Sequence, residues 1–161
     1  MAGHWPENWS RLIDGSDCEM CEAGRPESDQ YGIRIHAGEY SDAYLQRADV
    51  QRGYTVVIWR GRHVNDPTEL TGEEASSYWA DVLLVARALI TYYEPLKMNY
   101  ETLGNALPHL HTHLVPRYAE GDPAPGRPFP LGVILDGPEP LLDTDRLERD
   151  ASALQKLVAG I

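Results

Sequence analysis

A run of alternating histidines is the feature that most limits what this chain can fold into. The segment 109–117 reads His-Leu-His-Thr-His-Leu-Val-Pro-Arg. Side chains of a β-strand point to alternate faces, so a strand here places three imidazoles on one face, those of His109, His111 and His113. The opposite face then carries the intervening Leu110, Thr112 and Leu114. Prolines at positions 108 and 116 disfavour a helix. The sequence therefore predicts a strand with one buried face.

The rest of the chain predicts an α+β fold. Apolar alternation, or a high content of β-branched and aromatic residues, indicates strands at 31–36, 40–46, 54–59, 96–102 and 108–118. Thr71-Gly-Glu-Glu74 is a capping box, and helical apolar spacing continues from it to Pro95. A C-terminal helix is predicted to end near Gly160. Neighbouring strands with short connections favour a mainly antiparallel sheet, covered on one side by the long central helix.

Composition and charge narrow the classes of function. The chain has 161 residues, enough for one domain with a core, and 14 basic against 25 acidic residues, a net charge of −11. Gripping a nucleic-acid polymer requires clustered Lys and Arg, so this balance argues against such a partner. We find no apolar run of membrane-spanning length and no secretory signal pattern. Both cysteines lie in one Cys-x-x-Cys unit, which is not a disulfide framework. We therefore expect a cytoplasmic protein.

Three histidines on one strand face indicate a functional cluster. Packing gains nothing from three imidazoles, and each buried ring needs a hydrogen-bond partner. Histidine both titrates and binds metals near neutral pH, which leaves two kinds of chemistry open. The rings could hold a catalytic zinc with an open position for water. Alternatively, one ring attacks phosphorus while its neighbours orient it and donate to phosphate oxygens.

The motif His109-Leu-His-Thr-His-Leu-Val resembles the signature of the histidine triad (HIT) superfamily, in which three histidines alternate with apolar residues. Thr112 stands at an apolar position and departs from the signature. Asn99, the Gly-Asn turn at 104–105 and the Val-Pro-Arg after the triad also resemble the family. The pattern resembles that of bacterial zinc-containing HIT-like nucleotide hydrolases, which are similar to diadenosine polyphosphate hydrolases.

The resemblance also implies a domain organisation. It covers about residues 15–120 and implies a single HIT-like domain over residues 1–161. An N-terminal arm, residues 1–17, is expected to be irregular. Residues 119–161, a Pro-rich segment and the C-terminal helix, lie outside the core resemblance.

The resemblance implies a reaction at the middle histidine. His111 is expected to attack the α-phosphorus of a nucleotide derivative, giving a nucleotidyl-histidine that water then cleaves. His113 is expected to hydrogen-bond a phosphate oxygen or the leaving group. The implied activity is that of a nucleotide phosphohydrolase or nucleotidyltransferase without a catalytic cofactor. It would act on the phosphoanhydride bond of a dinucleoside polyphosphate or on a nucleoside phosphoramidate.

Three amide side chains are expected to bind substrate on the same resemblance. Asn99 matches an amide position that contacts phosphate or the leaving group. Asn105 stands where several relatives have the longer Gln. Gln46 falls, by its spacing from Gly53, where the family usually has Asp or Asn for ribose hydroxyls. Each of the last two changes the reach of the side chain.

A structural zinc site is expected beside the triad. Cys18 and Cys21 supply half of a tetrahedral zinc site. His63 and His109 are the candidates for the other two ligands, as the pattern of many bacterial triad proteins implies. Four protein ligands leave no open position, so this metal would be structural. The family resemblance also suggests a homodimer.

Two other interpretations remain open. The chain could be a nucleotide-binding module with little turnover. It could also be a metal-dependent hydrolase that uses the triad histidines as ligands, although the sequence contains neither a His-Glu-x-x-His motif nor a paired Asp motif that would supply carboxylate ligands.

Overall fold

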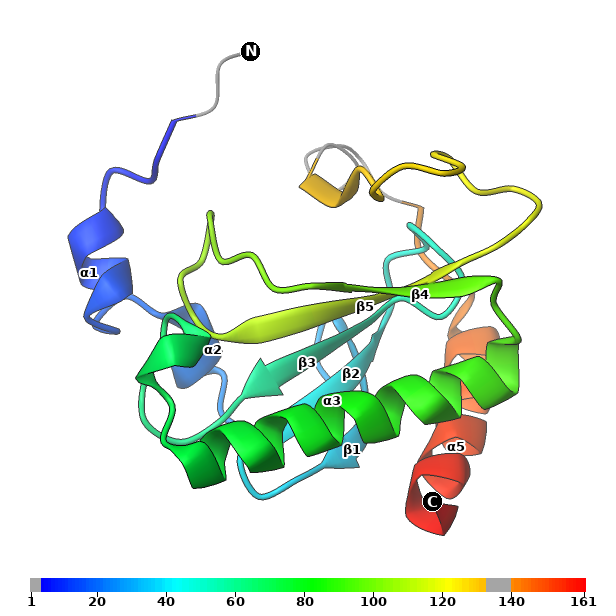
Figure 1. The fold of residues 1–161 in the computed structure, drawn as a ribbon, viewed down its shortest axis with the longest axis horizontal. Coiled ribbons are helices and arrows are strands. Elements are labelled where there is room, and N and C mark those ends of the chain that lie inside the picture. Colours follow the sequence, from blue (N-terminus) through cyan, green and yellow to red (C-terminus); the bar gives the residue numbers. More distant parts are fainter. Residues whose placement is uncertain (1–3, 133–139) are drawn as a thin grey trace.

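The computed structural model describes residues 4–132 and 140–161 of the chain. Within these residues, five strands form one antiparallel sheet in the order β1-β2-β3-β5-β4 (Figure 1). The strands are β1 Gly32–Ala37, β2 Ser41–Gln46, β3 Thr55–Trp59, β4 Lys97–Glu101 and β5 His111–Arg117. The predicted α+β class with a mainly antiparallel sheet is confirmed. Part of the predicted Pro-rich segment, 133–139, lies outside the described residues.

Helices accompany the sheet at both ends of the chain and between β3 and β4. They are α1 Trp9–Ile13, α2 Glu19–Glu22, the 3-10 helix η1 Pro67–Glu69, α3 Gly72–Tyr93 and α5 Thr144–Gly160. The predicted capping box starts α3, because Thr71 Oγ accepts from the Glu74 amide at 3.2 Å and the Glu74 carboxylate accepts from the Thr71 amide at 2.8 Å. The predicted central and C-terminal helices are both confirmed.

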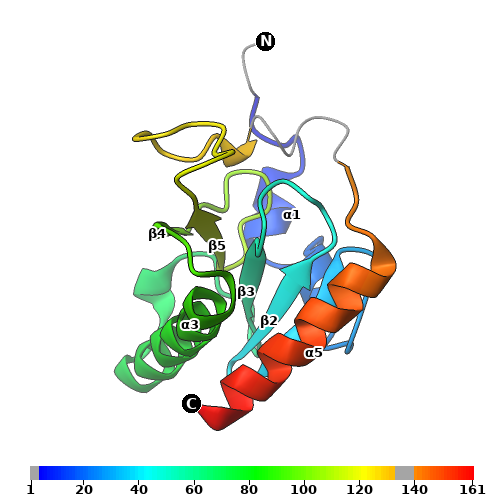
Figure 2. The same ribbon diagram turned by 90° about the vertical axis from the view of Figure 1, so that its right-hand side faces the viewer.

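The core lies between one face of the sheet and the two long helices (Figure 2). Strand residues such as Val57 and Leu114 pack there with Val82 and Leu89 of α3. α5 joins the same core through its own apolar side chains, among them Leu147, Leu154 and Val158. Thr112 also points to this side, where its hydroxyl lies 2.9 Å from the Tyr78 hydroxyl. The departure from the apolar pattern is therefore accommodated by a buried hydrogen bond.

The face of the sheet opposite the core carries two of the three histidines. In the β3–β5 register, Val56 lies opposite His113 and Ile58 lies opposite His111. In the β2–β3 register, Tyr44 lies opposite Val56. Directly opposed residues share a face, so the two histidines belong to the face that the long helices do not cover.

Two boundaries differ from the sequence-based expectation. The N-terminal arm is not wholly irregular, because residues Trp9–Ile13 form α1 and bury Leu12 against the protein. β5 begins at His111 rather than at residue 108. Ahead of it the His109 amide bonds to the Leu107 carbonyl within a turn, and the Leu110 amide bonds to Val64 beyond the end of β3. His109 is thus held by a turn and not by the strand.

None of the helices in residues 4–132 and 140–161 has the length and apolar character needed to cross a lipid bilayer.

Candidate active site and metal centre

A cavity of about 450 Å³ opens on the histidine face of the sheet. His111 and His113 lie side by side in its wall, with ring centroids 4.7 Å apart. Val56 and Ile58 of β3 contribute an apolar part of the same wall. The cavity therefore combines apolar side chains with two imidazoles, a composition typical of small-molecule sites.

The backbone fixes the tautomer of His111. Its Nδ1 lies 2.6 Å from the carbonyl oxygen of His109. A carbonyl can only accept, so Nδ1 carries the proton and Nε2 carries the lone pair. Burial lowers the pKa of His111, which favours the neutral ring. A neutral imidazole with a free Nε2 lone pair is a nucleophile.

His113 has a partner that the sequence did not suggest. Its Nδ1 lies 2.8 Å from the hydroxyl of Tyr54, and the two rings stack at 5.9 Å. Burial, with a smaller effect of His111, lowers the pKa of His113 to about 3, so this ring is neutral at pH 7. The sequence did carry one signal: Tyr54 precedes β3 in phase with Val56 and Ile58, which puts it on the histidine face.

The four residues expected to bind metal come together next to this cavity. The candidate ligand atoms of Cys18, Cys21, His63 and His109 all lie within 4.8 Å of one another. The shortest separations are 3.3 Å, from Cys18 Sγ to His109 Nδ1 and from Cys21 Sγ to His63 Nδ1. Both cysteines are free thiols. These residues could hold a metal ion, as the sequence predicted.

The surroundings of the two histidines suit metal binding. His109 Nε2 lies 2.8 Å from the Trp59 carbonyl, and His63 Nε2 lies 3.0 Å from the Asn65 side-chain oxygen. Each acceptor holds the proton on Nε2 and leaves the Nδ1 lone pair directed at the thiols. Two thiolates and two imidazoles form a soft tetrahedral donor set that matches zinc. The residues present therefore fit the expected metal.

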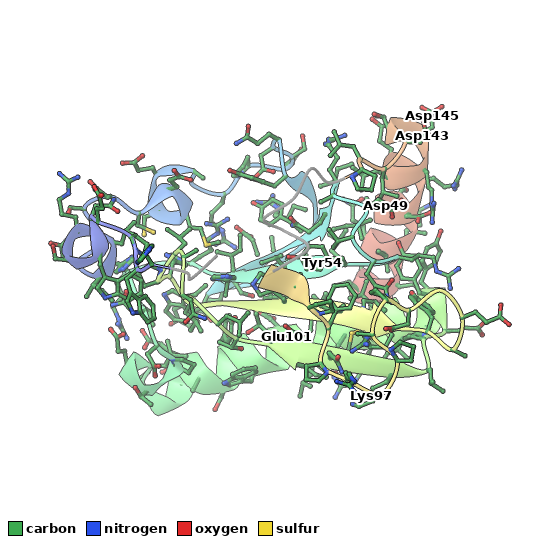
Figure 3. All side chains as sticks on the ribbon, turned by 90° about the horizontal axis from the view of Figure 1, so that it is seen from above. Asp49, Tyr54, Lys97, Glu101, Asp143 and Asp145 are labelled. Carbon is green, nitrogen blue, oxygen red and sulfur yellow. The ribbon has the colours of Figure 1, made fainter. Side chains whose placement is uncertain are left out.

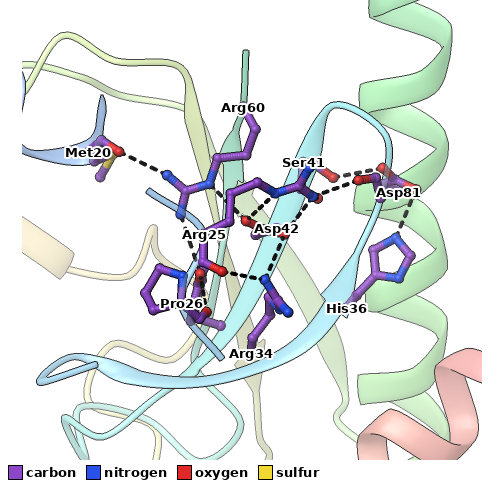
Figure 4. A network of polar contacts seen from close by, with 11 residues as sticks. Met20, Arg25, Pro26, Arg34, His36, Ser41, Asp42, Arg60 and Asp81 are labelled. Carbon is purple, nitrogen blue, oxygen red and sulfur yellow. Dashed lines mark hydrogen bonds and ion pairs between the residues drawn. The ribbon is translucent and has the colours of Figure 1, made fainter. Parts of the chain in front are cut away.

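An ionic cluster around the buried Asp42 fixes the segment that carries the cysteines (Figure 4). Asp42 of β2 is fully buried and accepts from Arg25 at 2.8 and 2.9 Å and from Arg60 at 3.0 Å. Arg60 also donates to the carbonyl of Met20, between the two cysteines, at 2.9 Å. The sheet thus positions the Cys-x-x-Cys unit through side chains that are not ligands themselves.

The expected substrate-binding amides are not all brought together. Gln46, at the end of β2, lines the same cavity as His111 and His113, and its Nε2 donates to the Tyr44 carbonyl at 3.1 Å. Asn99 lines a second cavity of about 920 Å³ along β4, and Asn105 is exposed in the loop between β4 and β5. The structure therefore joins Gln46 to the histidines and leaves the two asparagines apart from them.

The side chain of Asn99 is hydrogen-bonded to the buried Arg117. Its side-chain oxygen accepts from Arg117 Nη1 at 2.6 Å. Arg117 also forms a two-pronged ion pair with Asp122, at 2.6 and 2.7 Å, and both side chains are buried. The last residue of β5 therefore binds the segment that follows it.

Asp122→Asn is expected to lower the free energy of unfolding by about 3 kcal/mol at pH 7, because Arg117 would stay buried without its counter-charge. The hydrogen bonds from Arg117 lower the pKa of Asp122 from 3.8 to about 2. The native state therefore binds this proton less readily than the unfolded chain. The stabilisation is complete above about pH 4 and is lost as the pH falls toward 2. Urea unfolding at pH 7 and at pH 3 measures both effects.

The neighbouring Glu120→Gln serves as the matched control, because Glu120 is exposed. A difference between Asp122→Asn and wild type that is equal at the two pH values would contradict this account of the ion pair.

Comparison with known proteins agrees with the geometry. The family model described as "HIT domain" matches residues 28–120. "Protein hit" of Bacillus subtilis (strain 168) is 33% identical over an alignment of 94 residues, and the match covers 55% of this chain and 64% of that protein. The chain thus spans slightly less than two thirds of the length of this curated relative.

Solved structures share the fold. A histidine triad protein from Bradyrhizobium japonicum superposes with a TM-score of 0.69 at 24% identity, covering 78% of this chain and 90% of that one. A Zn-bound histidine triad family protein from Mycobacterium smegmatis gives a TM-score of 0.64 at 22% identity, covering 90% and 95%. The family model matches more than half of the 161 residues, and the chain therefore belongs to the histidine triad (HIT) family.

Proposed function

We propose that this protein cleaves nucleotide derivatives at the α-phosphorus by covalent catalysis on His111. The observation that carries the proposal is the 2.6 Å contact between His111 Nδ1 and the His109 carbonyl, which leaves the Nε2 lone pair for attack. The cavity supports it, because apolar strand residues beside the histidines offer a surface for a base.

The reaction has two displacements at phosphorus. In the first, the Nε2 lone pair forms a bond to the α-phosphorus, and the bond from phosphorus to the leaving oxygen or nitrogen breaks. The leaving group departs with the electron pair and takes up a proton. In the second, water attacks the same phosphorus, loses a proton and displaces His111. The products are a nucleoside 5′-monophosphate and the regenerated imidazole.

The other site residues assist this chemistry by hydrogen bonding. We assign to His113 a hydrogen bond to a phosphoryl oxygen or to the leaving group, because it stands beside His111 in the cavity wall. Gln46, in the same cavity, is proposed to contact the ribose. Asn99 and Asn105 stay predictions as substrate-binding residues.

We further propose that Cys18, Cys21, His63 and His109 hold a structural zinc. A bound zinc would supply a cross-link between the N-terminal segment and the turn before β5. Because His109 also supplies the carbonyl that orients His111, a ligand shell closed by four protein atoms would stabilise the nucleophile's position and leave the chemistry to the histidines.

A homodimer is the proposed assembly. β4 forms one edge of the sheet, where Tyr100 of β4 is 42% exposed and the flanking Leu96 and Leu103 are 75% and 52% exposed. An unpaired sheet edge with exposed apolar side chains on and beside it favours pairing with another copy. Light scattering after gel filtration is expected to give twice the mass of one chain, and the mass of one chain would contradict the proposal.

A substrate panel tests the activity. Wild-type protein is incubated in H₂¹⁸O with a dinucleoside tetraphosphate and with a nucleoside phosphoramidate, and the products are analysed by mass spectrometry. We expect a 5′-monophosphate with one ¹⁸O on phosphorus from at least one substrate. Binding without product would support the alternative of a nucleotide-binding module. Loss of turnover on chelation, with unchanged folding and recovery on adding metal, would support a metal-dependent hydrolase.

A further inference from the structure

The segment after the triad covers one side of the active-site wall. Phe129 and Leu131 pack on Tyr54, Val56 and Val115 in a cluster separate from the main core. All five side chains are buried, with Tyr54 only 4% exposed. The segment runs over the sheet in Figure 1, and Figure 3 looks down on it with Tyr54 labelled beside it. The Pro-rich stretch thus has a packed position beside the site.

Arg117 holds this segment in place. Besides its ion pair with Asp122, it donates to the carbonyl oxygens of Ala124 at 2.8 Å and Arg127 at 3.0 Å. Its guanidinium also lies 5.3 Å from the centre of the Phe129 ring. Arg117, a buried side chain at the end of β5, therefore fixes the segment whose Phe129 and Leu131 pack on Tyr54.

Tyr54, on which these side chains pack, forms a hydrogen bond with His113. A phenol O–H is a stronger acid than the N–H of neutral imidazole, and an imidazole nitrogen is a stronger base than a phenol oxygen. The favoured arrangement at 2.8 Å is therefore O–H donating to Nδ1. One proton remains on the neutral ring, and it must then lie on Nε2.

We propose that Tyr54 is a positioning residue, which keeps His113 in the Nε2–H tautomer so that this ring donates a hydrogen bond to the phosphoryl group or leaving group of the substrate. Phe129 and Leu131 pack on the Tyr54 ring and so hold its hydroxyl against His113. The substrate part of this inference rests on the proposed function; the tautomer does not.

The two neighbouring rings consequently have opposite protonation. His111, bonded to a carbonyl through Nδ1, presents a lone pair at Nε2. His113, bonded to a hydroxyl through Nδ1, presents a proton at Nε2. A base that attacks and a donor that stabilises negative charge are both needed at a phosphoryl centre. The backbone and Tyr54 thus divide the two roles between chemically identical side chains.

Two-bond ¹⁵N–¹H correlation NMR of the imidazoles tests the tautomer in the wild-type, metal-loaded protein without substrate. His113 is expected to show one Nε2–H tautomer with a hydrogen-bonded Nδ1, and His111 the reverse. Tyr54→Phe is expected to shift the His113 Nδ1 signal toward that of a nitrogen without a donor. Tyr118→Phe is the matched control, because Tyr118 lies outside the cavity and its hydroxyl donates to the Arg52 carbonyl. It should leave the His113 signals unchanged.

Kinetics supply the second readout. Tyr54→Phe is expected to lower kcat about tenfold, the loss of one hydrogen bond that acts in the transition state, with KM changed by less than about twofold. An Nδ1–H tautomer of His113 in the wild type would overturn the proposal even if Tyr54→Phe fails to fold. A folded Tyr54→Phe with unchanged His113 signals and unchanged kcat would also overturn it. If no substrate is turned over, the proposed function fails, while the NMR result still decides the tautomer.

Discussion

His111→Ala is expected to lower kcat/KM by about three orders of magnitude or more, with the substrate still bound. The variant lacks the nucleophile. Among the described residues that line the cavity, His111 is the one histidine whose Nδ1 proton is held by a backbone carbonyl. Removing a covalent nucleophile leaves only the binding and charge stabilisation that the remaining groups provide. Steady-state rates with the substrate that the panel identifies give the measurement.

His4→Ala is the control for this substitution, because His4 is exposed and lies outside the cavity lining. It should keep the wild-type rate. The thermal midpoint of each variant shows whether the fold survives. A folded His111→Ala protein with the wild-type rate would remove His111 from the chemistry.

Cys18→Ala is expected to abolish zinc binding and to lower the thermal midpoint by roughly 6–12 °C. Cys18 is fully buried and is the N-cap of α2, and its Sγ lies within 4.8 Å of the other three candidate ligand atoms. A ligand present at about 100 times its dissociation constant contributes about 3 kcal/mol to the native state. For a chain of this size, each kcal/mol shifts the midpoint by roughly 2–4 °C. Metal analysis by mass spectrometry and thermal unfolding give the two results.

The matched control is Ser16→Ala, because Ser16 is exposed and is not among the grouped ligands. It should keep about one zinc per chain and the wild-type midpoint. A Cys18→Ala protein that retains its zinc, or that loses zinc without any change in midpoint, would contradict a structural role for the four residues.

Local sequence patterns were sufficient for most of the fold. The capping box at Thr71 and the helical spacing after it located α3, alternation located β1 and β5, and β-branched and aromatic content located β3. These signals work because they depend on periods within one element. The start of β5 was misplaced because the pairing of Leu110 with Val64 depends on where β3 ends, which no local pattern records. α1 was missed for a similar reason, since a five-residue helix carries too little periodicity.

For the site, too, local patterns predicted only part of the arrangement. Alternation alone put His111 and His113 on one face, and the Cys-x-x-Cys spacing indicated half of the metal centre. The family resemblance supplied the remaining ligands and the order of roles among the histidines.

Strand period alone puts Tyr54 on the histidine face, but its pairing with His113 could not be predicted. Tyr54 lies 59 residues away, and the two meet only through the sheet register and the packing of Phe129. The occupation of Asn99 by Arg117 likewise follows from the pairing of β4 with β5 and from burial. Long-range side-chain partners of this kind arise from tertiary structure rather than from any local period.

Detection of the covalent intermediate tests the central claim most directly. Protein and substrate are mixed, quenched within milliseconds at neutral to alkaline pH to preserve phosphoramidate bonds, and analysed by intact mass and by peptide mapping. The account predicts a nucleotidyl adduct on the peptide that carries His111, absent from His111→Ala. An adduct on another residue, or full turnover with no adduct and with inversion of configuration at phosphorus, would contradict it.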